Sequence, residues 1–177
     1  MLPLDVPIID TPRLRLRAFS EGDFAAYRAL VSDPEVMRYL GDGRPLDDLA
    51  AWRQLATILG HWVLRGFGLW AVEERDSRRF VGQAGLLEPG GWPGFEVAYA
   101  LHPSVWGRGY AREAAGAALR HARVVLGRRE IISIIRPGNA ASVRVATSLG
   151  AVRSHAIEFA GGTADVYRYP AQPQAGR

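Results

Sequence analysis

Polar and apolar residues alternate near the start of the chain, where Arg13–Phe19 read RLRLRAF. A period of two places one side of the backbone on a core and the other in solvent, so this segment is predicted to be a strand. Short apolar segments bounded by turn residues predict the later strands. They are residues 68–74, 79–88, 95–103 and 130–136, followed by a strand pair around 159–167.

Apolar residues at helical spacing predict the helices. Ser20 precedes 21–31 as an N-cap, with acids in the first turn, and 32–36 restarts the helix. The long segment Asp47–Leu64 is predicted to be amphipathic and to end at Gly66. Its apolar positions are Leu49, Trp52, Leu55, Ala56, Leu59, Trp62 and Val63, and we expect Trp52, Trp62 and Trp70 in the core. Two further helices are expected at 109–126 and at 140–149, the second closed by Gly150.

The order of these elements predicts an α+β domain with a mixed, mostly antiparallel sheet. At 177 residues the chain suits one domain, which we place at 1–170, with 171–177 as a disordered tail. No apolar run is long enough to span a bilayer, and the N-terminus lacks the pattern of a secretory signal. We therefore expect a cytoplasmic protein without a membrane partner.

The use of cysteine and of basic residues restricts the chemistry. The chain has no cysteine, which excludes thiolate metal sites and an acyl-cysteine intermediate, and we expect no metal. All 22 basic residues are arginine, which excludes a P-loop lysine or a Schiff base. Residues 1–100 carry a net charge of −3 and residues 101–177 one of +7. The arginines are scattered, so a small polyanion is favoured over nucleic acid as the ligand.

The stretch WGRGYAREA, residues 106–114, places two glycines at the start of a predicted helix. Bare backbone and the positive end of a helix suit a diphosphate. The dinucleotide pattern GxGxxG is excluded because the third glycine is missing. A tight turn without a ligand remains the alternative for this stretch considered alone.

Two longer segments extend the pattern: FEVAYALHPSVWGRGYAREA and RPGNAASVRVATSLGA. They resemble the central motifs of the GNAT N-acetyltransferases, in the ribosomal-protein-alanine acetyltransferase branch, and the resemblance covers nearly the whole chain. It implies a sheet of about seven strands flanked by about four helices. It also implies that acetyl-CoA binds through backbone amides of the loop Trp106, Gly107, Arg108, Gly109, Tyr110, Ala111 and Arg112. Phosphate contacts are open among Arg108, Arg112, Arg136 and Arg144.

Acetyl transfer from a thioester requires a neutral amine, a polarised carbonyl and a stabilised thiolate. Glu96 stands where the resembling strand carries its glutamate, on the same side as Ala98 and Ala100, and is the candidate base. The alternative for Glu96 is a solvated or salt-bridged strand carboxylate. Glu88 is the second candidate base, and His102 and His155 follow.

The thiolate needs a partner of its own. Ala146 replaces the tyrosine that many members of the superfamily use there. The resemblance implies Ser142 as the acid, with Asn139 beside the pantetheine, although the two also form an ordinary helix cap. Backbone N–H groups of Tyr99, Ala100 and Leu101 are candidates for polarising the carbonyl and contacting the cofactor.

The expected function is direct acetyl transfer from acetyl-CoA to a primary amine, either a protein N-terminus or a small molecule. The alternatives are a catalytically silent acyl-CoA-binding module and an acetylase for an amino acid, polyamine or antibiotic. Trp92, on a glycine-rich loop, is a candidate for lining the acceptor pocket, and a homodimer stays open.

Overall fold

The alternating segment near the N-terminus forms β2 (Leu14–Arg17) in the computed structural model, which describes residues 5–171. Leu14 and Leu16 are fully buried, whereas the two arginines between and after them are partly exposed. The predicted alternation is therefore confirmed. A two-residue strand, β1 (Ile9–Asp10), pairs with β2 and was not predicted.

Three helices follow, and each has a polar residue at its start. Ser20 and Asp23 form a capping box on the short 3₁₀ turn that leads into α1 (Phe24–Val31). Asp33 caps α2 (Pro34–Met37), and Asp47 caps α3 (Asp48–Arg65) by accepting backbone N–H groups. Gly66 ends α3 in the left-handed conformation, as predicted.

The apolar stripe predicted on α3 is only partly buried. Leu55 and Trp62 belong to the core, whereas Leu49 and Val63 are exposed. Trp52 was expected in the core but keeps 48% of its surface exposed, because it packs only one edge against Phe24. Trp62 and Trp70 are buried against each other, as predicted.

The later strands are β3 (Leu69–Glu74), β4 (Phe80–Leu87), β5 (Glu96–Leu101), β6 (Ile131–Ile135), β7 (Val152–Phe159) and β8 (Gly162–Tyr169). They complete one sheet in the order β1-β2-β3-β4-β5-β6-β8-β7, in which only β5 and β6 pair in parallel. The remaining helices are α4 (Tyr110–Val124), which connects β5 to β6, and α5 (Ala140–Ser148). The α+β class is confirmed. Within residues 5–171 there are eight strands and five α-helices, one more of each than expected.

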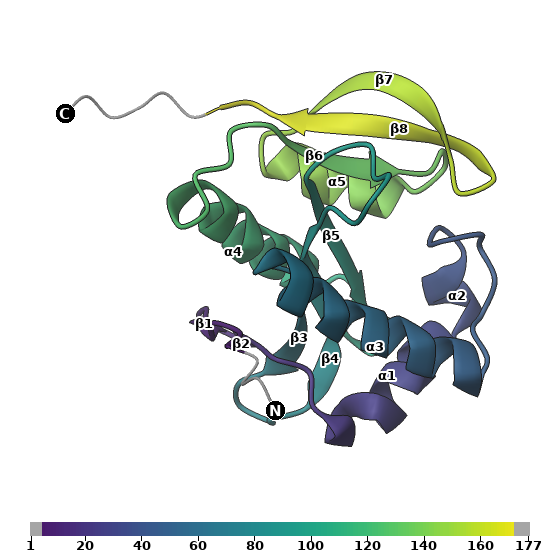
Figure 1. The fold of residues 1–177 in the computed structure, drawn as a ribbon, viewed down its shortest axis with the longest axis vertical. Coiled ribbons are helices and arrows are strands. Elements are labelled where there is room, and N and C mark those ends of the chain that lie inside the picture. Colours follow the sequence, from purple (N-terminus) through teal and green to yellow (C-terminus); the bar gives the residue numbers. More distant parts are fainter. Residues whose placement is uncertain (1–4, 172–177) are drawn as a thin grey trace.

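The helices gather in two groups (Figure 1). The sheet runs from β1 and β2 to β7 and β8. Helices α1, α2 and α3 form one group, in which α1 contacts α2, α3 and β4. Helix α4 packs on β2, β4 and β5 and also contacts α5. The end of β5 therefore meets the start of α4 close to α5, and this meeting point carries the candidate site.

The parallel pair β5–β6 separates almost at once. One register pair, Glu96 opposite Ile132, is recorded for it, whereas β4 and β5 pair along six residues. The N–H of His102 bonds to Val81 on β4, so alternate N–H groups of β5, those of Tyr99 and Leu101, point the other way. The sheet thus presents a gap lined by backbone donors between β5 and β6.

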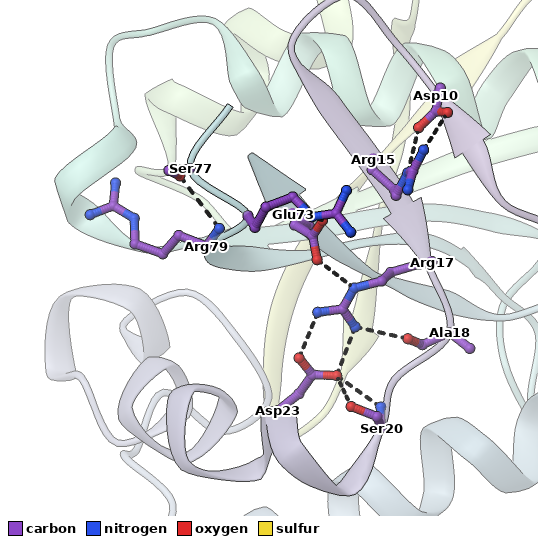
Figure 2. Close-up of polar contacts among 10 residues, drawn as sticks. Asp10, Arg15, Arg17, Ala18, Ser20, Asp23, Glu73, Ser77 and Arg79 are labelled. Atoms are coloured by element: carbon purple, nitrogen blue, oxygen red, sulfur yellow. Dashed lines mark hydrogen bonds and ion pairs between the residues drawn. The ribbon is translucent and has the colours of Figure 1, made fainter. Parts of the chain in front are cut away.

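A network of charges joins β2, β3 and the entry to α1 (Figure 2). The Arg17 guanidinium lies between the carboxylates of Asp23 and Glu73, at N–O distances of 2.7–2.8 Å. Asp23 and Glu73 are buried. The neighbouring pair Arg15–Asp10 is separate and more exposed.

The predicted tail at 171–177 lies, apart from Ala171, outside the described residues. Nothing in the fold tests the proposed boundary at 170. Among residues 5–171, no helix is both long and apolar enough to cross a bilayer.

Candidate active site

The loop between β5 and α4 takes its shape from two glycines. Gly107 and Gly109 have φ values of 74° and 78°, a region that other residues rarely adopt. Helix α4 begins at Tyr110, so the N–H groups of its first turn lack partners within the helix. The loop forms one wall of a cavity of about 610 Å³, which we call the large cavity. Unpaired donors and a helix N-terminus at its wall make that wall suitable for an anion.

The large cavity collects nearly all of the residues expected to bind cofactor. Tyr99, Ala100, Leu101, Trp106, Gly107, Gly109, Tyr110, Ala111, Arg112 and Asn139 all line it. Arg108 does not. Its guanidinium turns away from the cavity to pair with Glu74 at 3.0 Å and to lie over the Tyr110 ring. Any contact of Arg108 with the cofactor must therefore come from its backbone.

Of the other arginines expected to contact phosphate, two line the large cavity and one does not. Arg112 and Arg144 line the large cavity. Arg136 instead donates to the carbonyls of Gly41 and Ala160, tying the loop after α2 to the β7–β8 turn. Arg38, which follows α2, lines the cavity and was missed by the sequence analysis. Nothing in its sequence surroundings marks it, because only the tertiary fold brings α2 to this wall.

Glu96, the predicted base, begins β5 and is buried, with 6% of its surface exposed. Among residues 5–171 it has no ion-pair partner, so the expected alternative of a solvated or salt-bridged carboxylate is wrong. The indole of Trp92 donates to Oε2 at 2.8 Å, and the N–H of Ile134 donates to Oε1 at 3.2 Å. Burial raises the pKa of Glu96 to about 7, although these two hydrogen bonds oppose the rise. A carboxylate with a pKa near neutrality suits proton transfer.

A second, smaller cavity of about 50 Å³ contains Glu96, and we call it the carboxylate pocket. Its volume admits an amino group or a few waters. Five residues line both cavities: Tyr39, Leu40, Tyr99, Asn139 and Ser142. They mark the junction at which a ligand in the large cavity comes nearest to the carboxylate.

Asn139 and Ser142 occupy that junction at the start of α5. Asn139 caps the helix by accepting the N–H of Ser142 at 3.1 Å, so the helix-cap interpretation is correct for these two residues. The cap uses the backbone of Ser142 and leaves the hydroxyl available. The hydroxyl of Tyr99 donates to the Ser142 carbonyl at 3.1 Å, which brings a second hydroxyl to the junction. Ala146 is fully buried in the core.

The remaining candidates lie elsewhere. Trp92 packs in a T-shaped arrangement with Phe159 and donates a hydrogen bond to Glu96. Glu88 pairs with Arg128 and lines neither cavity. His102 caps the 3₁₀ turn after β5, and His155 is exposed on β7. Among residues 5–171, no three His, Asp or Glu side chains gather as a metal site would require.

Comparisons with known proteins identify the family of the chain. The acetyltransferase (GNAT) domain family matches residues 13–152. YkkB, an uncharacterized protein of Bacillus subtilis (strain 168), is 33% identical over 148 residues, which are 79% of this chain and 82% of the relative.

Two solved structures are similar along nearly their whole length. An acetyltransferase from Agrobacterium tumefaciens str. C58 has a TM-score of 0.83 at 30% identity, covering 96% of this chain and 97% of that one. RimL, a ribosomal L7/L12 α-N-protein acetyltransferase in complex with coenzyme A, has a TM-score of 0.77 at 18% identity, covering 93% and 98%. The second likeness concerns the fold. The family match spans most of the chain, and the chain therefore belongs to the GNAT acetyltransferase family.

Proposed function

We propose that this protein transfers an acetyl group from acetyl-CoA directly to a primary amine, with Glu96 as the base. The observation that carries the proposal is the junction between the two cavities. The large cavity begins at the unpaired donors of the α4 N-terminus and ends beside a buried carboxylate whose pKa is near 7. An extended thioester with a diphosphate at one end matches this layout.

The chain's own residues supply the steps. Glu96 accepts a proton from the incoming ammonium, directly or through water in the carboxylate pocket, and the amine attacks the thioester carbonyl. N–H groups of Tyr99 and Leu101 face the gap between β5 and β6, where they can polarise that carbonyl. The carbon–sulfur bond then breaks, and the thiolate receives a proton from a hydroxyl at the junction. The second proton that the attacking nitrogen loses as the amide forms restores that hydroxyl. The absence of cysteine supports direct attack in a ternary complex.

For the acceptor, the proposal names a chemical class, a primary amine. A protein N-terminus is supported by the similarity in fold to a ribosomal-protein acetyltransferase. A small-molecule acceptor and a silent binding module remain the alternatives, and the cytoplasm and a homodimer remain predictions. Intact-mass analysis of a peptide and amine panel incubated with protein and acetyl-CoA tests them. Binding without any acetylated product across the panel would favour the silent module.

Replacing Gly109 with valine is expected to weaken acetyl-CoA binding at least about tenfold, because a β-branched residue at this φ strains the loop that presents the donors. Gly127→Val is the matched control, since Gly127 also has a positive φ but lies outside both cavities. Calorimetric titration with acetyl-CoA measures both variants. Equal affinity of the two variants for acetyl-CoA would show that the loop is not part of the binding site.

Replacing Ser142 with alanine is expected to lower kcat several-fold and leave the KM for the amine nearly unchanged, since a proton given to the thiolate matters mainly in the transition state. Thr147→Ala, on an exposed position of the same helix, is the control. Steady-state kinetics at saturating acetyl-CoA checks the prediction. An unchanged kcat would shift the role to the Tyr99 hydroxyl, which stays protonated because burial raises its pKa.

A further inference from the structure

Arg13 lies just before β2, about a hundred residues from the loop between β5 and α4, and contacts that loop from outside the large cavity. Its Nη1 donates to the carbonyl oxygen of Arg108 at 2.8 Å. Its guanidinium also lies 4.8 Å from the centroid of the Tyr110 ring, and Nη2 is the nearest atom to a Cβ built on Gly109. Arg13 therefore contacts Arg108 and Tyr110, the residues on either side of Gly109.

A second set of contacts holds Arg13 itself in place. Glu113, in the first turns of α4, accepts the backbone N–H of Arg13 at 2.9 Å and its Nε at 2.7 Å. The Thr11 hydroxyl donates to the same carboxylate at 2.7 Å. Glu113 thus holds both the backbone and the guanidinium of Arg13, which orients the side chain better than a single surface ion pair does.

The bond to Arg108 determines where an amide points. The peptide between Arg108 and Gly109 is planar and trans, so its carbonyl and its N–H point in opposite directions. Arg13 holds the carbonyl on the outer side, and the N–H of Gly109 consequently points toward the large cavity, which Gly109 lines. One of the two torsions that turn this peptide is the φ of Gly109, which glycine can change at little steric cost, so an external restraint is needed to hold the peptide in one orientation.

We infer that Arg13 is a positioning residue for the cofactor: it holds the Arg108–Gly109 peptide in the orientation that presents the Gly109 N–H to the diphosphate of acetyl-CoA. The inference rests on the proposed location of the diphosphate at this loop. Arg13 itself touches no part of the cofactor, so its effect is confined to ligands that carry the diphosphate.

The test compares Arg13→Met with Arg15→Met. Arg15 lies two residues further along the chain, pairs with Asp10 and does not contact the loop. Arg15→Met therefore removes the same positive charge as Arg13→Met without disturbing the loop, and it controls for the general effect of charge on binding a polyanion. Arg13→Met should bind acetyl-CoA about 10-fold more weakly, the size expected for losing a charge-assisted hydrogen bond, while Arg15→Met should stay within about twofold of the wild type. Arg13→Lys keeps a positive charge beside Glu113 but lacks the second guanidinium nitrogen that reaches the Arg108 carbonyl, so its affinity should stay close to that of Arg13→Met.

Acetyl-pantetheine, which lacks the diphosphate, separates positioning from general damage. With this donor, Arg13→Met should match the wild type in kcat and KM, while with acetyl-CoA only KM should rise. Equal losses with both donors, or wild-type acetyl-CoA affinity in Arg13→Met, would overturn the role of Arg13. Unchanged affinity in Gly109→Val as well would instead overturn the proposed loop site.

Arg13→Met leaves the Glu113 carboxylate without its guanidinium partner, and this carboxylate could then repel the diphosphate. A further variant controls for that repulsion. In the double variant Arg13→Met/Glu113→Gln, affinity should stay as weak as in Arg13→Met. Recovery to wild-type affinity would assign the effect to charge repulsion and overturn the positioning role.

Discussion

Glu96→Gln is expected to lower kcat/KM by about 10²–10⁴-fold, the range typical for loss of a general base. The carboxylate is the only acidic group that lines the carboxylate pocket among the described residues, and the amide that replaces it cannot accept the proton. Acetyl-CoA affinity should change little, because Glu96 does not line the large cavity. Steady-state kinetics and calorimetry of the same preparation provide the two readouts.

The pH dependence gives this prediction a second readout. Burial raises the pKa of Glu96 to about 7, so the group is neutral in acid and ionised above that pH. A base must be ionised to accept a proton, so kcat/KM of the wild type should rise with pH through about 7. Glu96→Gln should lose this rise.

The matched control is Glu88→Gln, since Glu88 pairs with Arg128 outside both cavities. It should keep wild-type turnover and the wild-type pH profile. If Glu96→Gln kept them too, positioning of the two substrates without a side-chain base would be the better account of the rate. If Glu88→Gln lost them, the second sequence candidate would be the base.

Arg17→Met is expected to lower the free energy of unfolding by about 2–4 kcal/mol, somewhat less than for a fully buried pair because the guanidinium keeps some solvent contact. The change leaves the buried carboxylates of Asp23 and Glu73 without their shared partner. Arg15→Met, which breaks only the more exposed pair with Asp10, should cost much less stability than Arg17→Met. Urea denaturation at neutral pH measures both variants, and equal losses would contradict the prediction.

Acidification should reveal the same network. Burial alone would raise the pKa of Asp23, but hydrogen bonds from Arg17 and Ser20 outweigh it and lower the pKa below the ordinary value of 3.8. A carboxyl with a lowered folded pKa stabilises the fold above the unfolded pKa, and this contribution is lost as the pH falls through the folded pKa. As the pH falls from neutral to below 3.8, the wild type should therefore lose more stability than Arg17→Met.

Local sequence patterns were enough to predict most of the helices and strands and to nominate the candidate site residues. Period-two and helical patterns predicted the principal strands and helices, because local backbone geometry sets which positions share a face. The glycines at 107 and 109 predicted the loop, because only glycine adopts its φ values without strain. The motif around Asn139 predicted a helix start that the structure has.

The tertiary structure decided the environment of each of these groups. Glu96 could be assigned to a strand face from the sequence, but its burial depends on Trp92 from the preceding loop and on the N–H of Ile134 from β6. Arg108 lies inside the predicted loop, yet Glu74 on β3 draws its side chain away from the cavity. The exposure of Trp52 likewise depends on how much of the surface of α3 packs against other elements.

Residues from the first half of the chain were missed for the same physical reason. Arg38 and Tyr39 reach the cavity walls only because the fold sets α2 against the end of β5, and no local pattern records a contact between such distant segments. The sequence analysis predicted Arg13 only as part of an alternating strand. Its contact with Arg108 spans 95 residues, a separation at which only packing of the whole sheet and of α4 determines which side chains meet.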